Sequence, residues 1–553
     1  MSSTLVILPI HLFDIDIIIE TINTLDTLHT LDTQSTISTI YIIEEPIYFG
    51  DRDVKLNFNK LKLIYHRASM KYYHDYLEKN MSKKNKHNNS KTITMTYLDY
   101  NDLKSKTSSG YKTIKGHSKI HMFDPVDTLL ESKYAKLFGK KLNYLESPLF
   151  LCSNKNLEEY HKTKPNKDSY THASFYKWQR TRLHILENDK TYDTENRNKM
   201  PLDTKIPPLP KNDSKSHYKY LVEAIEYINK SPVFSNNLEP LYVSVGSSGD
   251  NRHHLTPESI HFPITHKSSI AWLEHFCKTR LEHFGKYEDS IDSVPRNFLF
   301  HSTISPMLNI GLITPEQVIT IVSNYYNNHN NHNKNKSSGG GSGIDISTYE
   351  GFMRQVIGWR EYQRYIYKYI GDKMRHSNHF KNNRTLKDNW YKATTGINPV
   401  DDAIMLAMND GYIHHILRLM VVGNFMNLVG IHPDEVYKWF MEFSMDSYDW
   451  VMIGNVYSMT LWADGGLTMR KPYISGDGYI MKMGNYKSKG DGDGDGNWNT
   501  IWNNVFHHFI DRNQEPLSKT YYNGIVKAWI RKSEKDKKEE LTKANQFINS
   551  ISH

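Results

Sequence analysis

The chain has 553 residues, which is too long for one compact core and predicts two or three domains. Its two cysteines, Cys152 and Cys277, exclude a disulfide framework and the four thiolates of an iron–sulfur cluster, and are expected to be reduced intracellular thiols. The net charge of +8 mildly favours a polyanionic partner.

Two features of the sequence bear on where the protein works. Its apolar runs fall short of the ~20 residues that span a bilayer, and residues 1–23 have no basic region before an apolar one. We therefore expect no membrane association and no secretory signal, but an intracellular protein located in the cytoplasm or wherever its partner resides. The bias toward Asn and Lys suggests an AT-rich genome, such as that of a virus or a protist.

Residues 1–144 alternate between strand-like and helix-like segments. Apolar or β-branched runs at residues 5–13, 38–46, 91–98 and 118–123 predict strands, and the apolar spacing at residues 15–25 and 60–77 predicts helices. This alternation predicts a Rossmann-like parallel sheet with helices on both faces. Glu44 and Glu45 end the second strand at the edge where ligands of such sheets bind, although a G-x-G-x-x-G dinucleotide fingerprint is missing.

The remainder of the chain is predicted to be helical. Residues 145–240 form a connecting region with one helix at residues 173–186, and residues 241–553 are helical by period, so the second domain is expected to be all-α. Low-complexity inserts at residues 327–343 and 487–498 cannot bury apolar surface and are expected to be mobile loops. The DGDGDG run imitates a calcium loop, but its twelfth position is Trp502 where glutamate is required, so we expect no metal site.

The stretch from Tyr412 to Tyr479 is rich in polar and aromatic residues within apolar sequence. On a predicted helix, His414 and His415 point about 100° apart, so they cannot both face one point, and Arg418 lies one turn after His414. One interpretation is that one histidine is hydrogen-bonded in the core while the other is a cap or a surface residue. The other is that this stretch forms the floor and wall of a cofactor-and-ligand cavity.

A polar loop, HSTISPMLN, supplies groups that could contact such a cofactor. The side chains of Ser302, Ser305 and Asn309, together with backbone N–H groups, suit a phosphate or a ribityl chain. Taken alone, the loop is also an ordinary turn that starts a helix.

Eleven segments carry a resemblance to a known family. In chain order over about 420 residues they are FNKLKLIYHRASMKYY, LESPLF, FYKWQRTRL, YDTENRNKMP, FGKYEDS, LFHSTISPMLNIGLITP, EGFMRQVIGWREY, YIHHILRLMVVGNF, DEVYKWFMEF, YDWVMIGNVY and ADGGLTMRKPYISGDGYI. The chain resembles the photolyase/cryptochrome superfamily, and within it the photolyase-related branch best known for bacterial (6-4) photolyases that carry an iron–sulfur cluster.

The resemblance implies an α/β antenna domain at residues 1–144 and a helical FAD-binding domain at residues 241–553. It also implies a lumazine-type antenna near Glu44 and Glu45, UV-damaged DNA as the partner, and a monomer. Residues implied to surround the flavin are His301, Ser302, Ser305, Asn309, Glu350, Arg354, Arg360, Asn455, Asp464 and Gly465. Residues implied at the lesion are His415, held to move a proton, with His414, Arg418, Tyr473 and Tyr479.

The chain departs from this pattern in two places. All four cluster cysteines are replaced, in ATTGINPVDDAI near Asp402, in NYKSKGDG and in WNTIWNNVF, so we expect no iron–sulfur cluster. The electron-transfer path is altered as well. Trp439 is kept, but Phe440 stands in place of a tyrosine, Thr394 in place of a tryptophan and Met452 in place of a glutamate, which leaves Trp390, Trp450 or Trp462 as alternative carriers.

Two functions follow as expectations from the resemblance. The first is light-driven repair of (6-4) photoproducts by an electron from reduced FAD and a proton from a pocket histidine, which is a natural acid near neutral pH. The second is a cryptochrome-like flavin photoreceptor without repair activity, which the altered electron-transfer residues favour. The intact histidines and tyrosines favour the first.

Overall fold

The computed structural model describes residues 2–29, 36–88, 93–164, 169–187, 190–192, 197–210, 217–241, 255–293, 298–334, 343–488 and 497–553. The N-terminal lobe contains five parallel strands in the order β3-β2-β1-β4-β5. They are β1 (Ser3–Ile7), β2 (Ile37–Ile43), β3 (Thr94–Leu98), β4 (Lys119–Phe123) and β5 (Leu142–Leu145). This order is that of a doubly wound sheet and confirms the predicted α/β class.

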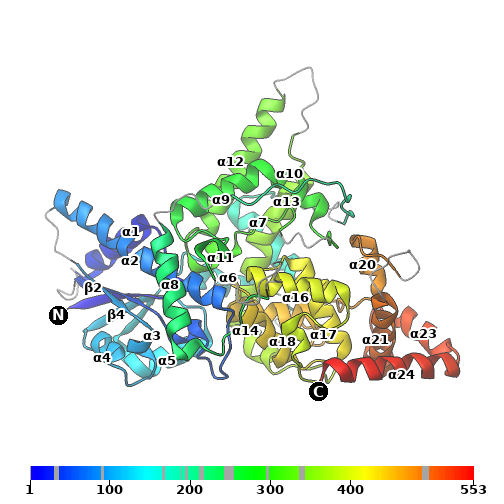
Figure 1. The fold of residues 1–553 in the computed structure, drawn as a ribbon. Coiled ribbons are helices and arrows are strands. Elements are labelled where there is room, and N and C mark those ends of the chain that lie inside the picture. Colours follow the sequence, from blue (N-terminus) through cyan, green and yellow to red (C-terminus); the bar gives the residue numbers. More distant parts are fainter. Residues whose placement is uncertain are drawn as a thin grey trace, which may run out of the picture.

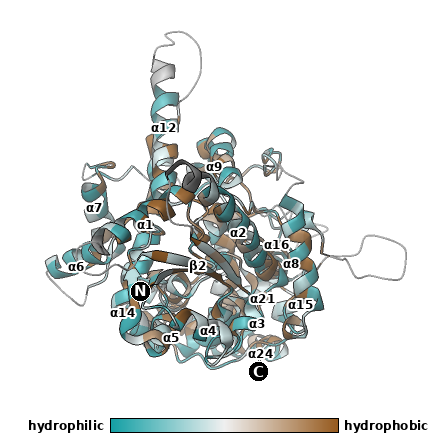
Figure 2. Cartoon of the chain, turned by 90° about the vertical axis from the view of Figure 1, so that its left-hand side faces the viewer, coloured by the Kyte–Doolittle hydropathy of each residue, from teal (hydrophilic) through white to brown (hydrophobic). Residues whose placement is uncertain are grey.

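Helices cover both faces of this sheet, as the sequence predicted. On one side lie α1 (Ile15–His29) and α2 (Lys60–Asn88), and on the other α3 (Tyr100–Leu103), α4 (Ser109–Lys115) and α5 (Thr128–Phe138), as Figures 1 and 2 show. The sequence did not predict β5, because its residues are only half-buried or exposed and show no apolar run.

Residues 145–240 contain three helices, α6 (Asn154–Thr163), α7 (His172–Leu183) and α8 (Tyr218–Lys230). They do not simply bridge two lobes. Helix α8 packs along α2, and α7 packs against a segment of the second lobe, η6 (Arg354–Arg360). The connecting region therefore covers parts of both lobes.

The second lobe is helical, which confirms the predicted all-α class. Its longer helices are α9 (His266–Thr279), α10 (Leu281–Tyr287), α12 (Pro315–Lys334), α13 (Ile346–Met353), α14 (Glu361–Arg375), α16 (Asn398–Asp410), α18 (Pro433–Phe443), α20 (Asp477–Met483), α21 (Trp498–Arg512), α23 (Asn523–Arg531) and α24 (Glu534–Ile551). Shorter ones are α11 (Ser305–Ile310), α15 (Asn389–Lys392), α17 (Asn424–Val429), α19 (Asp449–Met452) and α22 (Gln514–Ser518). None of the described helices is long and apolar enough to cross a membrane.

The first low-complexity insert differs from its prediction. Helix α12 continues through residues 327–334 and projects from the body of the molecule in both views (Figures 1 and 2), so the loop prediction was wrong there. Residues 335–342 of that insert and residues 489–496 of the second lie outside the described residues.

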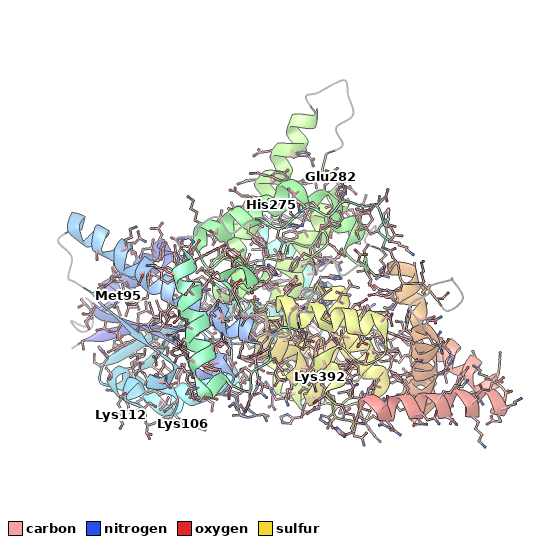
Figure 3. The ribbon with its side chains drawn as sticks, viewed as in Figure 1. Met95, Lys106, Lys112, His275, Glu282 and Lys392 are labelled. Carbon is pink, nitrogen blue, oxygen red and sulfur yellow. The ribbon has the colours of Figure 1, made fainter. Side chains whose placement is uncertain are left out.

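The two lobes share one contiguous apolar core that runs from Leu5 to Ile551. Polar contacts across their boundary include Asn59 Nδ2 donating to the carbonyl of Met408 at 2.8 Å. Some cationic side chains, such as Lys62 and Arg364, are buried, whereas others lie on the outside of both lobes. Exposed Lys106 and Lys112 lie on the N-terminal lobe and exposed Lys392 on the helical lobe (Figure 3).

Candidate functional site

A cavity of about 550 Å³ lies within the helical lobe. Its volume is within the range of ligand pockets. Twelve of the residues predicted for the flavin, the lesion or electron transfer line it: His301, Ser302, Ser305, Asn309, Arg354, Arg360, His415, Arg418, Trp450, Asn455, Tyr473 and Tyr479.

Three π-helical segments form much of the cavity wall. They are η6, η7 (Leu417–Gly423) and η8 (Ile453–Thr460), and each contributes lining residues. A π-helical turn inserts a residue relative to an α-helix, is rare, and is frequent at functional sites. The wider turns redirect side chains toward the cavity, which the apolar periodicity of these segments did not reveal.

Asp446 is the polar centre of one wall, and the sequence did not single it out. Its carboxylate forms a bidentate pair with Arg418, with N–O distances of 2.9 and 3.1 Å, and accepts a 2.6 Å hydrogen bond from Ser305. Its carbonyl accepts from Asn309 at 2.9 Å. Burial would raise the pKa of Asp446, but Arg418 and the hydroxyls of Ser305 and Ser444 outweigh burial and keep that pKa below its usual value.

The two adjacent histidines have different environments. His414 lies just before the helix rather than on it, and its ring stacks on that of His301 with centroids 4.5 Å apart and planes at 11°. His415 opens the helix and presents an exposed ring to the cavity. The cavity walls partly remove the ring from water, and this desolvation together with the charge of Arg418 lowers the pKa of His415 to about 4. His414 is thus the packed histidine and His415 the accessible one.

Buried polar atoms without partners point to a polar ligand. Gln363 lines the cavity and is 3% exposed, yet both polar atoms of its amide lack a hydrogen-bond partner among the described residues, as does Nε2 of His301. Unsatisfied buried groups are costly and rare in folded proteins. A ligand with both donors and acceptors would satisfy them, and these residues therefore fit a cofactor such as FAD.

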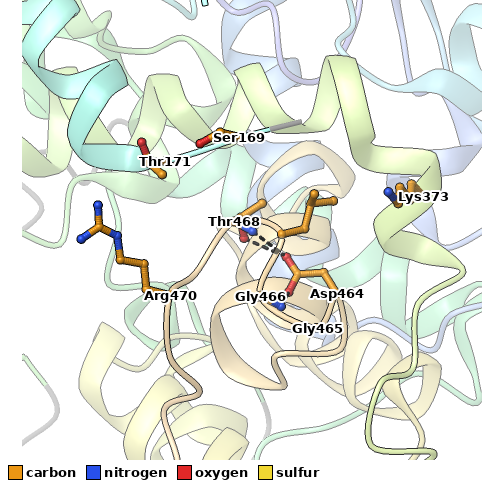
Figure 4. A pocket seen from close by; sticks show the side chains of 9 residues that line it. Ser169, Thr171, Lys373, Asp464, Gly465, Gly466, Thr468 and Arg470 are labelled. Atoms are coloured by element: carbon orange, nitrogen blue, oxygen red, sulfur yellow. Dashed lines mark hydrogen bonds between the residues drawn. The ribbon is translucent and has the colours of Figure 1, made fainter. Parts of the chain in front are cut away.

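Three residues predicted for the flavin lie elsewhere. Glu350 is fully buried behind the cavity, where it accepts hydrogen bonds from the hydroxyl of Tyr176 at 3.2 Å and from the backbone N–H of Tyr192. Asp464 and Gly465 line a separate pocket of about 420 Å³ (Figure 4).

In that pocket the side chain of Asp464 stabilises the turn that follows it. Its carboxylate accepts from the Thr468 hydroxyl at 2.9 Å and from the backbone N–H of Gly466 at 3.1 Å (Figure 4). Gly465 has φ +67°, a conformation that favours glycine. The structure thus does not bring these two residues to the cavity.

The predicted electron carriers lie at and behind the wall. Trp450 lines the cavity, with its ring edge-on to Phe150 at 4.9 Å. Trp439 and Trp390 are fully buried, and the indole N–H of Trp439 donates to the carbonyl of Trp390 at 2.8 Å. Phe440 lines the cavity beside Trp439, with ring centroids 5.1 Å apart.

The predicted antenna carboxylates are engaged by protein groups. Glu44 accepts from Arg67 at 2.7 Å, from the Tyr97 hydroxyl at 2.5 Å and from the backbone N–H of Tyr100 at 2.8 Å. Glu45 accepts from the hydroxyls of Tyr111 and Tyr134 and from Lys133, at 2.6, 2.5 and 2.5 Å. Both are completely buried, so each has little acceptor capacity left and neither fits a lumazine contact.

The segments expected at an iron–sulfur cluster do meet, but a hydrogen bond and aromatic contacts join them instead of cysteine ligands. The hydroxyl of Tyr486 donates to Asp402 at 2.8 Å, the ring of Tyr486 contacts Trp498 at 5.9 Å, and Trp498 contacts Trp502 at 6.1 Å. Neither cysteine is there, and the described residues contain no group of three or more His, Cys, Asp or Glu side chains placed to hold a metal. These side chains do not fit an iron–sulfur cluster.

Comparison with known proteins identifies the family. Residues 23–233 match the model of a deoxyribodipyrimidine photo-lyase-related protein, and residues 350–495 match the FAD binding domain of DNA photolyase. The chain belongs to the photolyase/cryptochrome superfamily, in its photolyase-related branch.

The chain is also similar to individual proteins. A (6-4) photolyase of Agrobacterium fabrum is 28% identical over 452 residues, which cover 78% of this chain and 81% of that protein. A protein of Acanthamoeba polyphaga mimivirus is 47% identical over 134 residues, 24% of this chain and the whole of that protein. The crystal structure of a bacterial class III photolyase from Agrobacterium tumefaciens has the same fold, with a TM-score of 0.52 at 14% identity, covering 100% of this chain and 98% of that one.

Proposed function

We propose that the protein is a photolyase that repairs (6-4) photoproducts in UV-damaged DNA, as an intracellular monomer, with FAD held in the cavity. The observation that carries the proposal is the cavity itself. It brings the accessible His415 together with Tyr473, Tyr479 and the Arg418–Asp446 pair, and it leaves Gln363 unsatisfied without a polar ligand.

The residues of the cavity wall bind and orient the FAD. His301, Ser302, Asn309, Arg354 and Arg360 offer hydrogen bonds and positive charge to a dinucleotide such as FAD. When bound and reduced, FAD supplies the electron for light-driven repair. Trp450 and the methionines of η8 and α19 line the same space and help to keep water out.

The lesion side is formed by His415, Tyr473 and Tyr479. Extruding a damaged base costs a few kcal/mol and is easiest for a lesion that pairs poorly. Tyrosine rings can stack on the extruded bases. Tyr479 is itself held by Asp289, which accepts its hydroxyl at 3.2 Å. In this proposal the imidazolium form of His415 gives a proton to the lesion. Arg418, fixed by Asp446, donates to the carbonyl of Ile413 and so positions the helix start that carries His415.

The experiment is illumination of the reduced protein with an oligonucleotide that carries one (6-4) photoproduct, followed by chromatography for restored thymines. Restored thymines are expected from wild type and not from His415→Ala. Failure of the wild type overturns the repair proposal, and equal affinity for damaged and undamaged duplex would then favour the photoreceptor alternative. Repair by His415→Ala would overturn only the role of that histidine.

A further inference from the structure

A pair of adjacent tyrosines forms part of the cavity rim. Tyr521 and Tyr522 lie in the turn before α23, which packs against α21 (Figure 1). Tyr522 lines the cavity, and its hydroxyl lies 2.5 Å from the carbonyl oxygen of Ile474 and 3.2 Å from that of Pro472. The turn is therefore fastened to the rim segment that carries Tyr473.

Tyr521, unlike Tyr522, is exposed to solvent. Its side chain is 82% exposed, and its ring is nearly perpendicular to that of Tyr522, at 88° with centroids 6.1 Å apart. The ammonium of Lys471 lies 5.2 Å from the Tyr521 ring centroid, and Lys471 also lines the cavity. An open aromatic face and a cation thus stand together where the cavity meets solvent.

Position and charge distinguish Tyr521 from an ordinary surface residue. Scattered exposed apolar side chains are normal and need no explanation. Tyr521, however, is anchored through its neighbour to a cavity wall, and the adjacent Lys471 offers a charge that suits a phosphate. Its ring is free to receive a flat partner without any rearrangement of the core.

The extrusion of a lesion leaves a base pair that an exposed aromatic ring could stack on. When damaged bases leave the duplex, the flanking base pair loses a stacking neighbour, and proteins that distort DNA often insert a side chain at such a step. Aromatic rings stack on bases of any sequence. A ring at the mouth of the cavity lies close to the gap that extrusion opens.

We propose that Tyr521 stacks on the base pair that flanks the extruded lesion, while Lys471 pairs with a phosphate of the same strand. The inference rests on the proposed repair function and names the residue that stabilises the DNA outside the cavity. Tyr522 is a positioning residue, since it holds the turn, and Tyr521 makes the contact.

The test compares affinities for three ligands at fixed salt: a duplex with one (6-4) photoproduct, the same duplex undamaged, and the isolated lesion dinucleotide. Tyr521→Ala is expected to weaken binding of the damaged duplex about tenfold or more, in keeping with the loss of one stacked base. Its affinity for the dinucleotide should stay at the wild-type value, because that ligand has no flanking pair. Tyr521→Phe keeps the ring and should bind as wild type does.

Two further variants act as controls. Ile530→Ala removes another exposed apolar side chain, 53% exposed on α23, the helix that follows Tyr521, and should change none of the affinities. Lys471→Gln should weaken damaged and undamaged duplexes alike and lower the slope of log K against log salt by about 1.

The outcomes separate the inference from the function on which it rests. A wild type that does not prefer the damaged duplex overturns both. If the wild type prefers the lesion but Tyr521→Ala binds the damaged duplex equally well, only the stacking role falls. Equal weakening of the dinucleotide by Tyr521→Ala would also overturn it, because the effect would then lie inside the cavity.

Discussion

At the scale of single residues, the environment of His415 determines how repair should depend on pH. Burial and Arg418 lower its pKa, so above that pKa the imidazolium fraction falls about tenfold for each pH unit. If the imidazolium is the proton donor, the single-turnover repair rate rises as the pH falls from 8 toward 6. His415→Gln should lose both the rate and this slope. A rate independent of pH in the wild type would contradict the assignment.

Some residues of the site could be predicted from the sequence, and others could not. His301, Ser305, Asn309 and Arg418 were predicted because they fall in polar segments that match the family pattern. Asp446 was not, because its importance comes from partners 28 and 141 positions away, Arg418 and Ser305, which only the fold brings to one point. Asp464 resembled a ligand-binding residue by motif, yet its carboxylate oxygens accept hydrogen bonds from Gly466 and Thr468 in the turn that follows it.

At the scale of elements, local pattern predicted strands and helices where the apolar period is strong. It could not distinguish α from π helices at η6, η7 and η8, since the same residues suit both and the choice depends on packing around the cavity. It also misplaced the end of α12. Asn and His are poor but tolerated helix residues, and the helix that starts at Pro315 simply continues through them.

Tyr486 lies outside the helices and bridges α16 and α21 through its side chain. Tyr486 is 4% exposed and joins Asp402 to Trp498 where the family pattern implies an iron–sulfur cluster. Tyr486→Ala removes a large buried ring and should lower the free energy of unfolding by about 3–5 kcal/mol. Tyr486→Phe keeps the ring but loses the hydrogen bond to the half-buried Asp402 carboxylate, and should cost about 1 kcal/mol.

Urea unfolding followed by tryptophan fluorescence measures both variants. The matched control is Tyr521→Ala, which removes the same side chain from the surface and should leave the unfolding midpoint unchanged. A cost for Tyr486→Ala no greater than that of Tyr486→Phe would show that the ring does not hold these helices together.

At the scale of the whole molecule, a buried ionic network joins the two lobes. Arg52 of the N-terminal lobe pairs with Asp127 at 2.9 Å and with Asp449 of the helical lobe at 3.3 Å. Asp449 also pairs with Arg375 at 2.6 Å and accepts from the Tyr367 hydroxyl at 2.7 Å. Since Asp449 precedes Trp450, the network connects the lobe boundary to the cavity wall.

This network predicts how stability responds to acid. Burial acts to raise the pKa of Asp449, but Arg52 and Arg375 outweigh it and lower that pKa to about 2, below the ~3.9 of an unfolded aspartate. A carboxyl with a depressed folded pKa stabilises the protein above the unfolded value, and this contribution is lost as the pH falls from about 4 toward 2. Thermal unfolding midpoints of the wild type should therefore drop across that window.

Asp449→Asn tests this assignment. Removing one partner of a buried ion pair costs about 3–5 kcal/mol, because Arg52 then keeps a buried charge with one carboxylate fewer to balance it. The variant should unfold at lower temperature at pH 7, and its midpoint should change less than that of the wild type between pH 4 and pH 2.

Asp127→Asn is the matched control. Burial raises the pKa of Asp127, so its ionised form gives less stability and its loss should cost less. If Asp449→Asn lost as much stability as the wild type on acidification, another carboxylate would have to couple the lobes.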